Sequence, residues 1–265
     1  MPDSDNRDED YIVEMDGVSK HFGEVVALED VDFRLRRKEV LALAGDNGAG
    51  KSTLIKCLAG ENKPTSGTIR INGEEIVIGN PRVAKELGIE TTFQDLAVAG
   101  NLTVTQNIFL GREQVTGPDS LFGVLNKNSM RERAQALLDD LEIDVDVSAK
   151  VSNLSGGERQ LVSISRTMLS DPKIVIMDEP TSALSVEGAD RVLNLIDRMQ
   201  SQGISIILIS HNLEYIKQAA DRIHVLHQGR SAGVIENTDI DRDEIVKRMI
   251  GGMPDDERSE QTTHA

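Results

Sequence analysis

The stretch that decides the fold spans residues 45–53 and reads Gly45-Asp46-Asn47-Gly48-Ala49-Gly50-Lys51-Ser52-Thr53. It fits the pattern G-x-x-x-x-G-K-[ST], in which glycines let successive backbone N–H groups turn toward phosphate oxygens. The apolar run Val40–Ala44 precedes it, and a helical pattern through Leu58 follows it. A strand before the loop and a helix after it are the context that the pattern requires, because the helix N-terminus adds partial positive charge. The stretch therefore predicts a phosphate-binding loop.

Two residues of this loop and two acids elsewhere predict a nucleotide hydrolase. Lys51 is placed to neutralise the β and γ phosphates, and the hydroxyl of Ser52 can ligate Mg²⁺. The apolar run Ile174–Met177 ends in Asp178 and Glu179. Adjacent carboxylates are often solvated surface charge, but at the end of a buried strand Asp178 can hold the Mg²⁺ shell. Glu179 can then orient or deprotonate the attacking water.

The runs around these motifs predict a mostly parallel α/β sheet. Five β-rich runs occur, at Val40–Ala44, Ile89–Phe93, Ile174–Met177, Ile204–Ile209 and Ile223–Leu226. The first four lack alternation, as expected of strands that are buried on both faces, and the last is mixed. Helical patterns separate several of them, among them Gly188–Gln202, and strand–helix alternation favours parallel strands with right-handed crossovers.

Two regions depart from this alternation. Tyr11–Met15 and Val31–Leu35 alternate apolar and polar residues, and Thr68–Ile71 precedes an Asn-Gly turn, so a small antiparallel sheet is expected. Residues 95–170 are mainly helical, with predicted helices at Val104–Leu110, Lys127–Leu141 and Gly156–Leu169 and a Gly- and Pro-containing loop at 111–126.

Residues 154–160, LSGGERQ, carry a second glycine-rich helix start. Ser155 with Glu158 three residues later forms a capping-box pattern, which is a sufficient structural reason for both residues. A glycine-rich helix N-terminus with a free hydroxyl also binds anions. Because the chain already has one phosphate loop, this segment would serve a second nucleotide.

Over residues 11–251 the sequence closely resembles the ABC (ATP-binding cassette) ATPase family. The resemblance rests on the phosphate loop, Gln94, LSGGERQ, the Asp178–Glu179 pair and His211, which occur in the family's order and spacing. It implies a P-loop NTPase (RecA-like) α/β core with an antiparallel β subdomain and a helical subdomain at about 95–170. It also implies a head-to-tail homodimer that holds two ATP molecules with Mg²⁺.

The resemblance implies further roles for single residues. Phe22 corresponds to the aromatic residue that stacks on adenine; the alternative is a core phenylalanine. Gln94 matches the glutamine that senses Mg²⁺ and the attacking water, and His211 matches the histidine that contacts the γ-phosphate. In the family, the signature residues of one copy complete the nucleotide site of the other. The corresponding residues here are Ser155, Gly156, Gly157 and Glu158.

Two positions depart from the family pattern. Glu158 stands where glutamine is commonest, a change that the capping role tolerates, so no loss of activity is expected. Ser185 stands where most members have aspartate in a loop that crosses the dimer interface. With serine at this position, the sequence does not determine how strongly the two ATP sites of the dimer are coupled.

Composition limits the partners. The chain of 265 residues carries 29 Lys and Arg against 45 Asp and Glu, a net charge of −16, which argues against a nucleic-acid partner. The single cysteine, Cys57, lies in an apolar run and is expected in the core. No signal peptide or membrane span is evident, so a cytoplasmic protein is expected, with polar, disordered tails at 1–10 and 252–265.

Residues 93–98 (FQDLAV) and 101–113 (NLTVTQNIFLGRE), together with 45–56 (GDNGAGKSTLIK), resemble those of cassettes of ribose, xylose and fructose importers. The expected partners are a second copy, transmembrane permease subunits that hold the chain at the inner face of the membrane, and indirectly an extracellular solute-binding protein. Leu96, Val98 and Leu102 either contact the permease or pack within the helical subdomain. A soluble ATPase of the iron–sulfur assembly type, a cassette for a non-sugar solute and a scaffold with little turnover are the alternatives.

Overall fold

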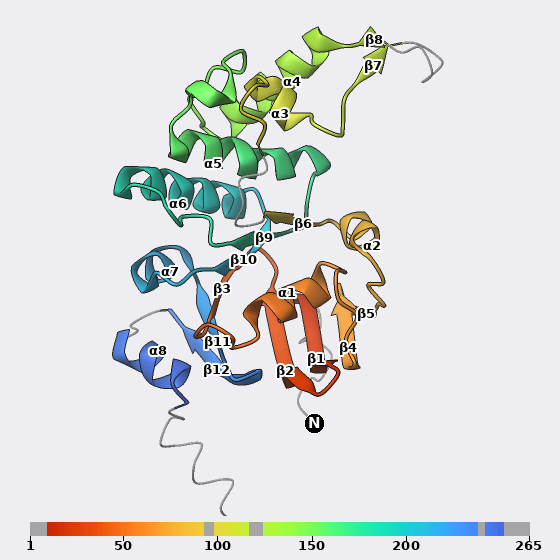
Figure 1. Ribbon diagram of the computed structural model, residues 1–265, viewed down its shortest axis with the longest axis vertical. Coiled ribbons are helices and arrows are strands. Elements are labelled where there is room, and N and C mark those ends of the chain that lie inside the picture. The colour runs from red at the N-terminus through yellow and green to blue at the C-terminus, as the bar shows by residue number, and fades with distance from the viewer. Residues whose placement is uncertain (1–9, 93–97, 117–123, 238–241, 252–265) are drawn as a thin grey trace, which may run out of the picture.

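The computed structural model describes residues 10–92, 98–116, 124–237 and 242–251. A six-stranded sheet forms its centre, in the order β12-β11-β3-β10-β9-β6 (Figure 1). Its strands are β3 (Val40–Ala44), β6 (Ile89–Thr92), β9 (Ile174–Asp178), β10 (Ser205–Ile209), β11 (Arg222–His227) and β12 (Arg230–Glu236). Every adjacent pair is parallel except β11 with β12. The predicted parallel core is confirmed, and its strands bring their carboxyl ends to one edge.

Alternate residues of the central strands face two separate apolar clusters. In β3, Leu41 and Leu43 join the cluster that contains α1 (Lys51–Leu58), whereas Val40, Ala42 and Ala44 join the cluster that contains α6 (Val186–Ser201) and α7 (Leu213–Ala219). All five residues of β3 are buried, which is why the run shows no polar alternation. Cys57 is fully buried in the first cluster, as expected.

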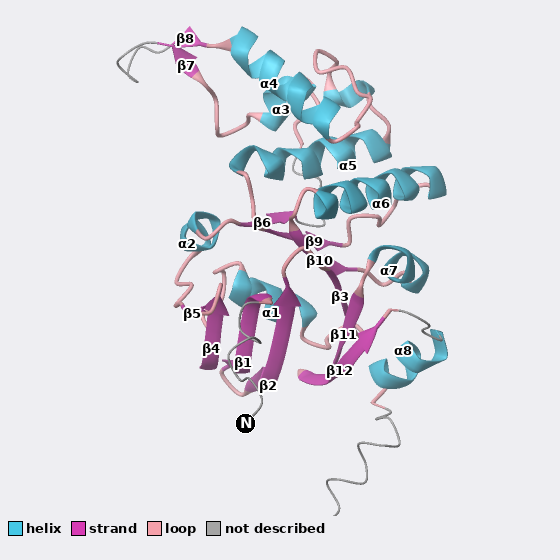
Figure 2. Cartoon of the chain, turned by 180° about the vertical axis from the view of Figure 1, so that it is seen from behind, coloured by secondary structure: helices cyan, strands magenta, loops and turns pink. Residues whose placement is uncertain are grey.

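The first face of the central sheet is covered by an antiparallel sheet as well as by α1 (Figure 2). The antiparallel sheet has the order β2-β1-β4-β5. Its strands are β1 (Tyr11–Phe22), β2 (Val25–Arg36), β4 (Ser66–Ile71) and β5 (Glu74–Glu75), and the short helix α2 (Pro81–Glu86) leads back to β6. The predicted antiparallel sheet is therefore confirmed, with longer first strands than the alternation indicates.

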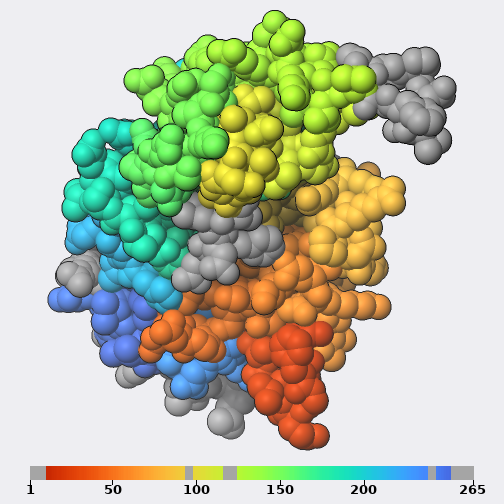
Figure 3. Space-filling view, turned by 45° about the horizontal axis from the view of Figure 1, so that its top comes forward, coloured from red at the N-terminus to blue at the C-terminus, as the bar shows by residue number. Residues whose placement is uncertain are grey.

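The helices of the predicted helical subdomain form a second lobe (Figure 3, yellow to green). They are α3 (Val104–Ile108), α4 (Lys127–Asp140) and α5 (Gly156–Ser165), with 3₁₀ turns η1 (Val151–Asn153) and η2 (Arg166–Ser170). A small hairpin of β7 (Val115–Thr116) and β8 (Val124–Leu125) lies in the region that the sequence predicts as a loop. The last described helix is α8 (Arg242–Met249), and no helix in the described ranges is both long and apolar enough to cross a bilayer.

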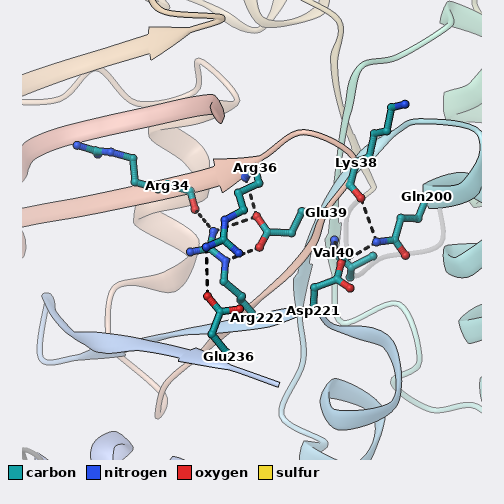
Figure 4. Close-up of polar contacts among 9 residues, drawn as sticks. All are labelled: Arg34, Arg36, Lys38, Glu39, Val40, Gln200, Asp221, Arg222 and Glu236. Carbon is teal, nitrogen blue, oxygen red and sulfur yellow. Dashed lines mark hydrogen bonds and ion pairs between the residues drawn. The ribbon is translucent and has the colours of Figure 1, made fainter. Parts of the chain in front are cut away.

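A buried polar network joins the antiparallel sheet to the central sheet (Figure 4). Arg222 of β11 and Glu39 are 5% and 4% exposed and form a two-pronged ion pair, with Arg222 Nη2 3.0 Å from Glu39 Oε2. Arg222 also donates to the carbonyl of Arg34, and the backbone N–H of Arg36 donates to Glu39. Both of these residues belong to β2, so the pair fixes β2 against β3 and β11. The charges are tolerated in the interior because they are paired and hydrogen-bonded.

Candidate functional site

The phosphate loop lies at the carboxyl end of β3 and is pressed between two other segments. Gly45, Gly48 and Gly50 have φ angles of 153°, 82° and 103°, which residues with a Cβ rarely adopt. A Cβ on Gly45 would lie 2.5 Å from the carbonyl oxygen of Leu226, and one on Gly50 would lie 2.8 Å from that of Ala27. Gly45 and Gly50 are therefore required by the packing as well as by the turn, whereas Gly48 is required by the turn alone.

Lys51 is the first residue of α1, and its side chain contacts the backbone of this loop. Its side chain donates to the carbonyl oxygens of Gly45 (2.7 Å) and Asp46 (3.1 Å), and the residue is only 7% exposed. Burial lowers the pKa of Lys51, while the carboxylates of Glu179 and Asp178 oppose that shift. A buried ammonium group bonded to the loop at the start of a helix fits a polyphosphate, and Ser52 beside it is exposed.

The acidic pair lies at the same edge of the sheet, at the end of β9. Glu179 has a left-handed φ of 51°, and its backbone N–H donates to the carbonyl of Ile209 at 2.9 Å. The backbone N–H and the hydroxyl of Ser182 both donate to the Glu179 carbonyl, at 3.1 and 2.9 Å. A non-glycine residue in this conformation is strained and persists because its backbone is fixed on both sides.

The carboxyl group of Glu179 is poorly solvated. Its side chain is 13% exposed, and Oε1 is buried, makes no hydrogen bond within the described residues and lies 3.5 Å from His211 Nε2. Burial raises the pKa of Glu179, with His211 opposing the shift, and burial likewise raises the pKa of Asp178 against Lys51. An unsatisfied buried carboxylate oxygen is a place for a water molecule to bind.

His211 follows β10, the strand that lies between β3 and β9. It is half exposed and lines a cleft of about 490 Å³ together with Glu179, Thr181, Ser182, Ser210 and Tyr215. Lys51, Asp178, Glu179 and His211 thus come from the carboxyl ends of three adjacent parallel strands. The structure brings together the residues that the sequence predicts for hydrolysis, apart from Gln94, which lies outside the described residues.

Phe22 lies at the tip of the β1–β2 hairpin and is 48% exposed, which contradicts the alternative of a core residue. It pairs with Val25, and Val25 and Val26 are also exposed, at 65% and 50%. Lys20 covers one side of the ring, 4.8 Å from its centroid. The same hairpin passes the phosphate loop, because Ala27 contacts Gly50. Sequence reasoning did not single out the two valines, although consecutive apolar residues beside a turn were a visible signal.

The signature segment lies on the other lobe, at the start of α5. The predicted capping box is present: Glu158 N–H donates to Ser155 Oγ (3.2 Å), and Ser155 N–H donates to Glu158 Oε2 (2.8 Å). The bond from Ser155 lowers the pKa of Glu158. Gly157 packs against Gly188 of α6, where an added Cβ would approach to 3.1 Å. Sequence reasoning missed this contact, which is a second reason for a glycine in the signature.

Ser185 has a structural role that the sequence did not reveal. It is the N-cap of α6, and its hydroxyl accepts a hydrogen bond from Gly188 N–H at 3.2 Å. Aspartate and serine are about equally good N-caps, so the substitution keeps this function. Ser185 and the signature residues line one pocket of about 510 Å³, which contains none of the phosphate-loop or acidic-pair residues.

The segment after Gln94 is only partly described. Leu96 lies outside the described residues, whereas Val98 packs against the larger apolar cluster, as the packing alternative predicts. Asn107 of α3 is fully buried and bonds both the N–H (2.7 Å) and the carbonyl (3.0 Å) of Ala99. Asn107 therefore fixes the chain beyond Gln94, a role that nothing in the sequence indicated.

The described residues contain no cluster of three His, Cys, Asp or Glu side chains able to hold a metal ion. The donors available at the phosphate loop are the Ser52 hydroxyl and the Asp178 carboxylate. Oxygen donors in small number suit Mg²⁺, which usually keeps water and phosphate ligands and takes only one or two from the protein.

Fold and site together define a P-loop nucleotide-binding cassette with a separate signature helix. The structure is similar to an ATP-binding cassette of an ABC transporter, MJ1267 (TM-score 0.77, 27% identity, 91% of this chain and 99% of that one). It is also similar to a nucleotide-free cassette (TM-score 0.76, 25% identity, 91% and 99%). The family model described as ABC transporter matches residues 28–182. The chain belongs to the ABC transporter family, and the predicted class of ATP-hydrolysing cassette is confirmed.

Two relatives are similar over most of this chain. The xylose/arabinose import ATP-binding protein XylG of Sulfolobus acidocaldarius is 44% identical over 220 residues, which are 83% of this chain and 86% of the relative. The ribose import ATP-binding protein RbsA of Clostridium perfringens is 39% identical over 246 residues, 93% of this chain. The match covers 48% of that relative, so this chain spans about half its length.

Proposed function

We propose that this chain is the ATP-hydrolysing subunit of a sugar importer, with a pentose as the transported solute. The observation that carries the proposal is the gathering of Lys51, Asp178, Glu179 and His211 at one edge of the parallel sheet. The names of the relatives supply the substrate class, since XylG and RbsA are named for import of xylose, arabinose and ribose.

The residues of the site divide the work of hydrolysis. The N–H groups of the phosphate loop and the Lys51 ammonium hold the β and γ phosphates in place. Ser52, Asp178 and Gln94 are the protein ligands that we assign to Mg²⁺, which when bound neutralises charge on the phosphate oxygens. Glu179 accepts a proton from the attacking water at its buried Oε1, and His211, whose Nε2 lies 3.5 Å from that oxygen, contacts the γ-phosphate.

The active form in this proposal is a head-to-tail pair of identical chains. Ser155, Gly156, Gly157 and Glu158 lie at a helix N-terminus, and the pocket that they line contains no residue of the phosphate loop of their own chain. Backbone N–H groups at a helix start bind phosphate, so this segment completes the site of a second copy. Contacts made only while the γ-phosphate is present favour the closed pair, and hydrolysis removes them.

A membrane permease receives this movement in the proposal. The chain is therefore placed at the inner face of the cell membrane through its permease, with an extracellular solute-binding protein as an indirect partner. The soluble iron–sulfur assembly alternative has no support from the relatives, whose printed names refer to sugar import. Uptake of either pentose in the experiment below would exclude a non-sugar solute.

The test is purification of the tagged chain from membranes of its host, with uptake of labelled xylose and ribose by the same cells. We expect a polytopic permease to copurify and uptake of one pentose to require the chain. Lys51→Ala should keep the permease but abolish uptake, because phosphate binding is lost while the surface is unchanged. Copurification of a soluble assembly complex without a permease would overturn the proposal.

A further inference from the structure

A buried carboxylate lies where the central sheet meets the helical subdomain. Glu90 belongs to β6, four positions before Gln94, and its side chain is 7% exposed. Burial of an ionised carboxylate is costly unless it is paired and hydrogen-bonded. None of the residues assigned to ATP hydrolysis contacts Glu90 in the described part of the chain, so its partners indicate a different role.

Two partners of Glu90 come from the helical subdomain: one follows α3, and the other ends η2, the last element before β9. Arg112, just after α3, donates from Nη2 to Glu90 Oε1 at 2.6 Å. The hydroxyl of Ser170, the last residue of η2, donates to the same oxygen at 2.7 Å. That hydroxyl also lies 2.9 Å from the carbonyl of Thr167, but its single proton favours the charged acceptor. We call Glu90, Arg112 and Ser170 the hinge cluster.

The hinge cluster joins the strand that precedes the helical subdomain in the chain to the element that ends it. In the chain, the helices of the helical subdomain come after β6 and before β9, and η2 is the last element before β9. η2 is continuous with α5, whose first turn carries Ser155 and the signature. Glu90 thus connects β6 to the last residue of η2, and any shift of Ser170 relative to β6 also displaces α5.

Arg112 adds a directional contact. Its guanidinium is a rigid fork, so the angle at which it meets a carboxylate is fixed more tightly than for a lysine. Its Nη1 is buried and has no hydrogen-bond partner within the described residues. The Arg112 side chain is 32% exposed, but its buried Nη1 is left without a partner in the described residues, and such an atom is costly. This argues that the position of the pair, and not its net stability, is what the residue provides.

The geometry points to a new role: the hinge cluster sets the position of the signature helix relative to the central sheet, with Glu90 and Arg112 as positioning residues for ATP-driven pairing. The inference rests on the proposed head-to-tail pair. ATP binding and the bonds of the phosphate loop do not involve the cluster. Its loss therefore weakens the pairing of two copies while each copy still binds nucleotide.

The experiment uses the full chain with Glu179→Gln as the parent, so that bound ATP is not consumed. Arg112→Met and Glu90→Met are each added, and the double variant is also made, because two apolar residues of similar volume replace a buried ion pair without leaving an unpaired charge. Light scattering gives the ATP concentration at half-maximal pairing, thermal unfolding gives stability, and binding of ADP gives the affinity of the single copy.

We expect each variant to need about 2- to 30-fold more ATP for pairing, the range of coupling changes that network residues cause. ADP affinity should stay unchanged. The double variant should regain stability relative to the single ones, because no charge is left unpaired, yet it should still pair poorly, because an apolar contact is not directional.

Lys85→Gln is the matched control. Lys85 approaches the other oxygen of the same carboxylate, at 3.9 Å, but it belongs to α2 on the side of the central sheet and is well exposed. Its loss should leave pairing unchanged. Recovery of pairing together with stability in the double variant would overturn the inference and make the cluster purely structural. Failure of the Glu179→Gln parent itself to pair would remove the proposed function and the inference with it.

Discussion

Glu179 combines three features that each cost stability. Its φ of 51° is left-handed, its Oε1 is buried without a hydrogen bond in the described residues, and burial raises its pKa. Strained backbone and shifted pKa values gather at functional sites, because a proton acceptor must be held in place and kept from full hydration. The residue is therefore expected to be useful for hydrolysis and harmful to stability.

We predict that Glu179→Gln makes the nucleotide-free chain more stable at neutral pH. A carboxyl whose folded pKa is raised binds its proton more tightly in the native state, so the native state is penalised above the unfolded pKa. The penalty is complete above the raised folded pKa and absent below the ordinary value near 4.3. The gain from the substitution should therefore shrink as the pH falls toward 4.

Thermal unfolding of both chains across this pH range checks the prediction. The variant should have the higher midpoint at pH 7.5, and the two midpoints should converge in acid. An equal difference at all pH values would mean that the gain comes from backbone strain or packing and not from the buried charge.

Phe22 gives a second prediction at the scale of one residue. Stacking of a base on an aromatic side chain is worth about 1–3 kcal/mol, so Phe22→Ser should raise the dissociation constant for ATP about 5- to 150-fold. Phe22→Tyr should bind ATP normally, because the face of the ring is kept. Val77→Ser removes another exposed apolar side chain, beyond the C-terminal end of α1, and serves as the control in the same titration. Equal affinity of Phe22→Ser and the control would exclude Phe22 as the adenine contact.

The residues that the proposed function assigns to phosphate, Mg²⁺ and the attacking water could be predicted where a motif fixes type, order and spacing at once. The phosphate loop and Asp178–Glu179 are of this kind, and the structure brings them to one edge. Glu90, Asn107 and Arg112 could not be predicted, since their contacts join segments far apart in the chain and single polar residues carry no pattern. Roles for Gln94 stay predictions, because that residue lies outside the described ranges.

At the scale of elements, the Arg222–Glu39 pair holds three strands of two sheets together (Figure 4). We predict that Arg222→Met lowers the free energy of unfolding by about 3–5 kcal/mol, because Glu39 would be left as an unpaired buried charge. Urea unfolding measures this loss. The double variant Glu39→Met/Arg222→Met should lose much less, since both charges are gone. An equally large loss in the double variant would show that packing, not charge, sets the effect.

Buried polar residues explain why the sequence pattern of β11 is mixed. The run Ile223–Leu226 is mixed in sequence, yet β11 is buried throughout except at His227, with Arg222 and His224 inside. His224 packs near Phe33, and burial lowers its pKa to about 4, so it is neutral and behaves as a packing residue.

The sequence predicts both ends of β3 correctly, because its five residues are apolar and both of its faces are covered. The hairpin of β7 and β8 has only two residues in each strand, too few for a periodic signal.

At the scale of the whole molecule, one chain holds the parts of two incomplete sites. The phosphate loop, the acidic pair and His211 lie at the edge of the parallel sheet, and the signature lies at the start of α5 with Ser185 beside it. Both halves are rigidly built: the loop by glycine packing, and the helix start by its capping box. In the proposed head-to-tail pair, a second copy completes each site and ATP joins the two copies.

The central claim is tested most directly by the mass of the Glu179→Gln chain in solution, measured by light scattering with and without ATP and Mg²⁺. We predict a single copy without nucleotide and a dimer with ATP, and hydrolysis at least ~10²-fold slower than in the wild type, because general-base catalysis is worth that much. Adding Lys51→Ala to this variant should abolish the dimer, since the phosphates lose their buried ammonium. A mass that stays that of one copy at saturating ATP, with the permease also supplied, would contradict the account.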